Sequence, residues 1–137
     1  MMQSMTSQTN FLERPEGRIA YTVMGHGPLV VAVPGMGDLR STYRDVVPPL
    51  VAAGYRVAVT DLRGHGESDT TFRRHGDDVT GADVLALIAE LGGPAVIIGN
   101  SMGAGAAAWA AAEESDAVAG LIPVSYTHLT LPTICSV

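Results

Sequence analysis

Residues 95–105 carry the sequence AVIIGNSMGAG, which decides the expected fold. Its apolar run, Ala95–Gly99, suits a strand buried on both faces, as in a parallel sheet. The Ala-rich segment Ser101–Glu114 favours a helix. Between them, Gly-Asn-Ser-Met-Gly places a serine two residues from a glycine on either side. A serine in this position between a strand and a helix is typical of a nucleophile elbow.

The elbow hypothesis assigns a role to each residue around Ser101. Gly99 and Gly103 let the strand and the helix approach closely at a strained turn. Ser101 lies at a helix N-terminus, where N–H groups favour developing negative charge. The N–H of Met102 is then one oxyanion donor. The alternative is a serine that caps an ordinary helix flanked by glycines.

Strands and helices are expected to alternate through the rest of the chain. Two apolar stripes at helical spacing predict helices. One runs from Tyr43 to Val51, where Pro48 and Pro49 should kink or delay it. The other starts at a capping box formed by Thr80 and Asp83 and ends at Gly92. The remaining strands are expected at Arg18–Val23, Leu29–Val33, Tyr55–Thr60 and Ala117–Val124.

Three polar or glycine-rich loops follow buried strands in this pattern. They are PGMGD (34–38), DLRGHGESD (61–69) and GNSMG (99–103). Alternating strands and helices form right-handed βαβ units with a parallel sheet. Sites in such sheets lie at the carboxyl ends of the strands. We therefore expect these three loops to meet at one site.

In their order and spacing, the three loops resemble the α/β-hydrolase family over residues 11–124. The resemblance implies an α/β fold class: the N-terminal half of an α/β-hydrolase fold, mostly parallel sheet with flanking helices, truncated before the last strands. It makes Gly35 a loop glycine and the Met36 N–H the second oxyanion donor. Pro34 stands where the family usually has histidine, which leaves the detail of this loop open.

The resemblance also implies a reaction. Ser101 would be the nucleophile of a triad completed by an acid and a histidine, acting on a small carboxylic ester or related acyl compound. Family members of the epoxide and haloalkane type normally use aspartate as nucleophile, so Ser101 counts against them. Asp116 and His128 follow in the right order, but Asp116 falls at the far end of the helix, about 20 Å from Ser101 at 1.5 Å per residue. His65, which precedes the nucleophile, is expected to be structural.

The two ends of the chain differ from the rest. Residues 1–10 are polar and expected to be disordered. Residues 125–133, SYTHLTLPT, resemble a translated sequencing adapter, so 125–137 is expected to be a non-native tail after a partial domain at 11–124. The acid and the histidine would then be missing. Without a base the serine stays protonated, so we expect this chain to be inactive.

Composition narrows the class further. The chain has 137 residues, 47% hydrophobic and 16% charged, which fits a globular protein. Its net charge is −6, so nucleic acid is not an expected partner. One cysteine excludes a disulfide framework. No membrane span or secretory signal is apparent. We expect a cytoplasmic protein with a small-molecule substrate, no cofactor and no metal, and leave its oligomeric state open.

Two other functions stay open. Gly99, Gly103 and Gly105 form a GxxxGxG pattern that resembles the phosphate loop of short-chain dehydrogenases, which would imply NAD(P) binding. That loop normally follows the first strand, and this chain has no lysine for the Tyr-x-x-x-Lys pair of that family. The third reading is a non-catalytic, hydrolase-like fragment.

Overall fold

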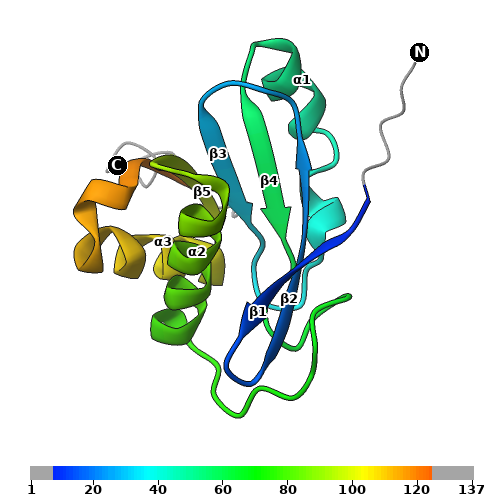
Figure 1. Cartoon of the computed structure of the whole chain (residues 1–137), viewed down its shortest axis with the longest axis vertical. Helices are drawn as coiled ribbons and strands as arrows, with labels where there is room; N and C mark the ends of the chain where they lie inside the picture. The colour runs from blue at the N-terminus through cyan, green and yellow to red at the C-terminus, as the bar shows by residue number, and fades with distance from the viewer. Residues whose placement is uncertain (1–7, 125–137) are drawn as a thin grey trace.

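In the computed structural model, which describes residues 8–124, six strands form one sheet in the order β1-β2-β4-β3-β5-β6 (Figure 1). Strands β3, β4, β5 and β6 are parallel, whereas β2 pairs antiparallel with β4 and β1 with β2. The expected α/β class is therefore confirmed. The strands are β1 Asn10–Arg14, β2 Gly17–Met24, β3 Leu29–Val33, β4 Arg56–Thr60, β5 Ala95–Asn100 and β6 Val118–Val124.

Helices flank the sheet on both faces. The long helices α2 (Asp77–Leu91) and α3 (Met102–Glu113) lie on one face. A 3-10 turn, η1 (Arg40–Tyr43), and the short helix α1 (Val47–Ala52) lie on the other. A second 3-10 turn, η2 (Ser115–Ala117), joins α3 to β6.

The central strand β3 is buried on both faces because each face packs against helices. Val31 and Val33 belong to the core under α2 and α3, whereas Val30 and Ala32 belong to the core under η1 and α1. Successive side chains of a strand point to opposite faces, so a continuous apolar run is needed here. The interpretation of this segment as a doubly covered strand is confirmed.

The expected elements occur with small shifts, and one was missed. The antiparallel edge strand β1 was not predicted: it is short, its sequence NFLER carries two charges, and Leu12 alone is fully buried. The two prolines of α1 occupy its first turn, where a missing N–H costs no helical hydrogen bond. Of the two expected effects, the prolines therefore delay the start of the helix to Val47 and do not kink it.

The expected capping box was wrong. Helix α2 begins at Asp77, after Gly76, so Thr80 and Asp83 lie inside the helix. The Thr80 hydroxyl is buried, and no described group bonds to it. Asp83 instead turns into the protein, toward arginines from two other segments. The predicted helix end is confirmed, because Gly92 adopts the left-handed conformation typical of that position.

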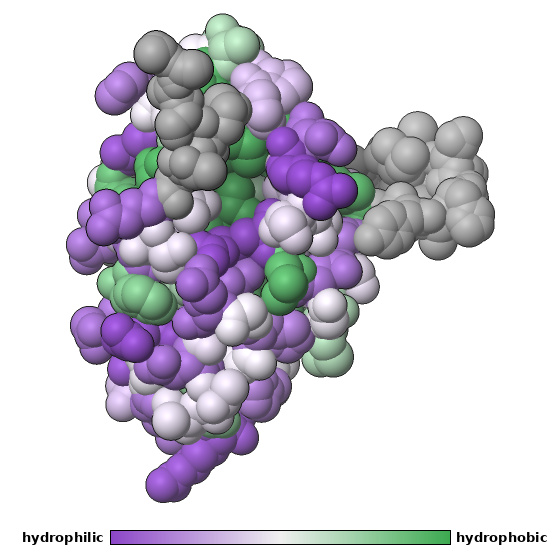
Figure 2. All heavy atoms as spheres, turned by 90° about the vertical axis from the view of Figure 1, so that its right-hand side faces the viewer, coloured by the Kyte–Doolittle hydropathy of each residue, from purple (hydrophilic) through white to green (hydrophobic). Residues whose placement is uncertain are grey.

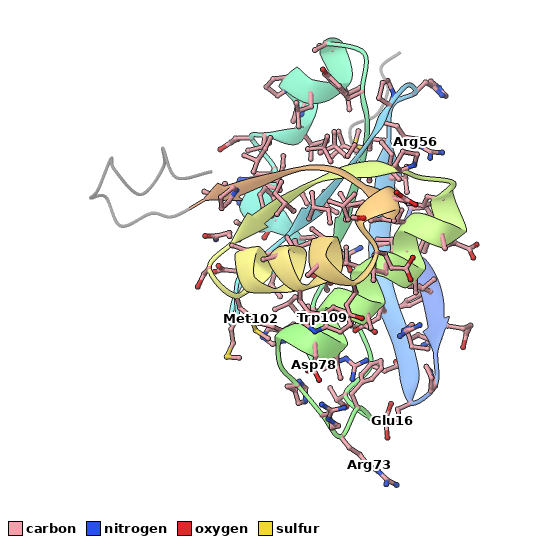
Figure 3. The ribbon with its side chains drawn as sticks, turned by 90° about the vertical axis from the view of Figure 1, so that its left-hand side faces the viewer. Glu16, Arg56, Arg73, Asp78, Met102 and Trp109 are labelled. Atoms are coloured by element: carbon pink, nitrogen blue, oxygen red, sulfur yellow. The ribbon has the colours of Figure 1, made fainter. Side chains whose placement is uncertain are left out.

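Small residues let α2 and α3 pack closely. A methyl group at Gly81 would lie 2.5 Å from Trp109 Cε3, and one at Gly105 would lie 2.4 Å from Asp77 Oδ2. Trp109, to which the sequence assigned no role, therefore lies at the contact between the two helices (Figure 3).

Both ends of the chain extend beyond the described residues. Residues 1–7 and 125–137, which hold most of the expected disordered segment and the whole expected tail, lie outside the described residues. Within the described part, no helix has the length and apolar character to cross a membrane.

Candidate active site

Ser101 lies at a sharp turn between β5 and α3. Its φ of 56° and ψ of −115° are strained for an L residue, and no other non-glycine within residues 8–124 has a positive φ. Such strain costs on the order of 1–3 kcal/mol and persists only where the surroundings impose it. The side chain is exposed. The strand–turn–helix context expected from the sequence is therefore present.

The glycines beside Ser101 permit close contacts that a side chain would block. A methyl group at Gly99 would lie 2.4 Å from the Gly103 carbonyl oxygen. One at Gly103 would lie 2.3 Å from the carbonyl oxygen of Val33, at the end of β3. Both distances are far below van der Waals contact. The elbow thus packs directly against the end of the central strand.

The loop at 34–38 lies against Ser101. A methyl group at Gly35 would be 3.1 Å from Ser101 Cβ and 3.0 Å from the Asn100 carbonyl oxygen. The Asp38 N–H donates to the Gly35 carbonyl at 3.0 Å, and Gly37 has a φ of +86°. These features match a type II turn with Met36 at its first central position.

Two backbone N–H groups near Ser101 are available to a ligand. Within residues 8–124 no hydrogen bond is formed by the Met36 N–H. Met102 is the first residue of α3, so its N–H has no acceptor within the helix. The Met102 side chain, at the start of this helix, is visible in Figure 3. That both groups serve as oxyanion donors stays a prediction.

The third loop, at 61–69, is anchored by buried polar groups. The Asp61 carboxylate accepts the Arg40 N–H at 2.9 Å and the Glu67 N–H at 3.0 Å. Gly66 is needed here, because a methyl group would lie 2.4 Å from Asp61 Oδ2. The buried Ser68 hydroxyl accepts the Ala20 N–H at 2.8 Å, which ties the loop to β2.

An arginine on η1 adds charge to this anchor. The Arg40 guanidinium pairs with Asp61 at 3.0 Å and with Glu67. The hydrogen bond from Arg40 lowers the pKa of the Glu67 carboxyl below its ordinary value. A hydrogen bond from the Thr9 hydroxyl contributes a smaller lowering of this pKa. Sequence analysis did not find this cluster, because its members come from three separate segments.

His65 connects the third loop to the first. Its Nε2 accepts the Gly37 N–H at 3.0 Å, and its Nδ1 lies 3.0 Å from the Arg63 carbonyl oxygen. The expected structural role fits these contacts. The three loops that the sequence placed together are thus joined in space, Gly35 to Ser101 and Gly37 to His65.

A buried ion cluster lies behind this loop. Asp83 of α2 receives both Nε and Nη2 of Arg63 at 2.9 Å, and Nε of Arg14 at 2.8 Å. The Arg63 guanidinium also lies 4.2 Å from the centre of the Phe72 ring. The available signal in the sequence was an acid, Asp83, within the apolar stripe of a helix. The sequence analysis interpreted this acid as part of a capping box.

The structure does not bring a base to Ser101 in its described part. Within residues 8–124 no histidine is hydrogen-bonded to Ser101; His26 and His75 are exposed, and His65 has the partners given above. Asp116 lies in η2, beyond the far end of α3, as expected. His128 lies outside the described residues.

A hollow of about 710 Å³ lies elsewhere, over β2 and β4 beside η1 and α1. Apolar side chains such as Met24, Val57 and Val59 line it, with Arg40 and Glu67 among its polar residues. Figure 2 shows apolar surface within a hollow on this side of the molecule. Ser101 does not line it, so the candidate active site is defined by backbone geometry instead.

Comparison with known proteins decides the family. A family model described as alpha/beta hydrolase fold matches residues 28–133. This chain belongs to that family. It is 32% identical over 103 residues to bifunctional epoxide hydrolase 2 of Sus scrofa. The matched region covers 73% of this chain and 19% of that protein. It is 36% identical over 102 residues to pimeloyl-[acyl-carrier protein] methyl ester esterase of Neisseria meningitidis, which covers 74% and 38% respectively.

Solved structures of the alpha/beta hydrolase fold agree. An epoxide hydrolase from an endophytic Streptomyces superposes with a TM-score of 0.76 at 30% identity, over 88% of this chain and 37% of that one. The chain therefore spans less than half the length of these relatives.

Family membership removes the support for a dehydrogenase phosphate loop. Two of the three glycines in that pattern lie at packing contacts of α3. A side chain at Gly103 would clash with Val33 of β3, and one at Gly105 would clash with Asp77 of α2.

Proposed function

We propose that this chain is the nucleophile-bearing part of a serine hydrolase that acts on a small carboxylic ester or related acyl compound. The observation that carries the proposal is Ser101 in a strained turn, with its side chain exposed and the Gly35 backbone beside its Cβ. Strained residues of this kind cluster at active sites. Among the relatives, the methyl ester esterase has the corresponding kind of activity in its name.

In the proposed reaction, the Ser101 hydroxyl oxygen attacks the carbonyl carbon of the ester. The oxygen of the tetrahedral intermediate accepts hydrogen bonds from the N–H groups of Met36 and Met102. Each such donor is typically worth about 10²–10³ in kcat. The alcohol leaves, and water then releases the acid from the serine.

A histidine must take the serine proton and pass it to the departing alcohol, and an acid must orient that histidine. Within residues 8–124 neither is placed at Ser101. We therefore propose that both lie outside residues 8–124. A site with an oxyanion hole but no base keeps about 10³–10⁴ of rate enhancement over water. This chain should therefore react slowly at Ser101 and turn over poorly.

A fluorophosphonate probe followed by peptide mass spectrometry tests the proposal. The Ser101 oxygen displaces fluoride from phosphorus and stays covalently labelled. The exposed Ser41 and Ser115 of the same chain are internal controls, because they lack the elbow geometry. Imidazole in the buffer supplies the missing base.

We expect an adduct on Ser101 that forms faster with imidazole and is absent from Ser101→Ala. Ser41 and Ser115 should stay unlabelled. An intact fold with no adduct on Ser101, or with equal labelling of the three serines, would contradict a serine nucleophile.

A further inference from the structure

We infer that His65 is a positioning residue that holds the oxyanion loop in place, and that it does so as one defined neutral tautomer. This inference rests on the proposed function, because it concerns the loop that carries the Met36 N–H. Its basis is the pair of contacts at the His65 ring, one to each of two loops.

The two contacts determine the protonation of the ring. The Arg63 carbonyl can only accept, so Nδ1 must carry a proton and donate it. The Gly37 N–H can only donate, so Nε2 must present its lone pair. A neutral ring protonated on Nδ1 satisfies both contacts. The opposite tautomer satisfies neither, and the imidazolium loses the contact to Gly37.

Hydrogen bonds also hold the backbone of His65 in place. Its N–H donates to the Leu62 carbonyl and its carbonyl accepts the Ser68 N–H, both at 2.9 Å. The Ser68 side chain is bonded to β2, and Asp61 holds the other end of the loop. The ring is therefore fixed relative to the sheet, which a free surface histidine would not be.

Among the amides of residues 36–38, the hydrogen bond to His65 leaves that of Met36 available. The Asp38 N–H is used within the turn and the Gly37 N–H is used by His65. The Met36 N–H has no bond within residues 8–124. The side chain of Met36 is 64% exposed, so packing of that side chain contributes little to holding the loop. The contact from His65 is thus a side-chain restraint on the turn.

Nuclear magnetic resonance can observe this contact without any reaction. In ¹⁵N-labelled protein at about pH 8, where an ordinary histidine is neutral, an N–H···N bond transmits a scalar coupling between its two nitrogens. We expect a coupling between Gly37 N and His65 Nε2, and ring ¹⁵N shifts that show the proton on Nδ1. A missing coupling, or a proton on Nε2, would overturn the inference.

Three variants extend the test. His65→Phe keeps a ring without an acceptor, His65→Gln restores an acceptor, and His26→Phe changes an exposed histidine as a matched control. We expect amide exchange at Gly37 to accelerate by about 2- to 13-fold in His65→Phe, the range of one typical hydrogen bond. It should recover at least partly in His65→Gln and stay unchanged in His26→Phe. Unchanged exchange in a folded His65→Phe would contradict the inference, and if that variant fails to fold the wild-type coupling still decides.

The fluorophosphonate reaction separates this inference from the proposed function. Slower labelling of Ser101 in His65→Phe, restored in His65→Gln, supports positioning of the oxyanion loop. Equal labelling of Ser101 in the wild type, His65→Phe and His65→Gln refutes the positioning role of His65, even if Ser101 is the nucleophile. An observed coupling without any labelling of Ser101 leaves His65 as the restraint on the turn and removes the catalytic role of the loop.

Discussion

Replacement of Asp83 by asparagine should strongly destabilise the protein. Asp83 is the shared counter-ion of Arg63 and Arg14, and its side chain is only 6% exposed. Asparagine has nearly the same shape but carries no charge. It leaves the Arg63 guanidinium, 8% exposed, beside a second arginine without an anion between them.

The size of the effect follows from the burial of the partners. Removal of one member of a buried ion pair typically costs about 3–5 kcal/mol. The Arg14 side chain is 22% exposed and can turn toward water, which favours the lower end. A loss of about 3 kcal/mol, with an m value of about 2 kcal/mol per molar urea, lowers the urea midpoint by about 1.5 M.

Equilibrium unfolding in urea measures this change. The single tryptophan, Trp109, reports on the contact between α2 and α3, and circular dichroism reports on the whole chain. Asp78→Asn on the same helix is the control, because the pair between Asp78 and Arg74 is exposed and its loss should lower the midpoint much less than the loss of Asp83. A shift of less than about 0.5 M in Asp83→Asn, where about 1.5 M is expected, would refute the reasoning.

Three further predictions can be checked with the same protein. Thr80→Val should stabilise it by about 1 kcal/mol in thermal melts, because the buried hydroxyl has no described partner. Arginine contacts lower the pKa values of Glu67, Asp69 and Asp78. The stability that these contacts give the folded protein should be complete above pH 4.5 and decrease on acidification below it. Measurement of Tm against pH, with and without high salt, tests this. Purified chain should show no sustained hydrolysis of nitrophenyl esters above Ser101→Ala.

The direction in which stability changes at acidic pH follows from the lowered pKa values. A carboxyl whose pKa is lower in the folded state binds fewer protons there than in the unfolded chain, so stability rises with pH through that range. These three groups are exposed, and salt should therefore weaken the effect. A Tm that is independent of pH between 3 and 5, a window of about the ordinary carboxyl pKa values, would contradict the prediction.

Much of the fold could be predicted from local pattern. The strands β3, β4 and β5 each contain a continuous apolar run, and a doubly covered sheet requires that pattern. The elbow was visible because its glycines are demanded by contacts within a few residues, such as Gly99 with Gly103. Edge strand β1 was missed because a strand with one buried side chain has almost no apolar period.

What the sequence by itself determined is the order of elements and the position of Ser101, because period, glycine and proline act over short distances along the chain. The tertiary structure alone decided the partners of polar groups. His65 meets Gly37 across 28 residues, and Arg63 meets Asp83 across 20. Such pairs depend on where packing of the sheet and helices leaves each loop. The same physical reason turned Asp83 from an expected helix cap into the centre of a buried ion cluster.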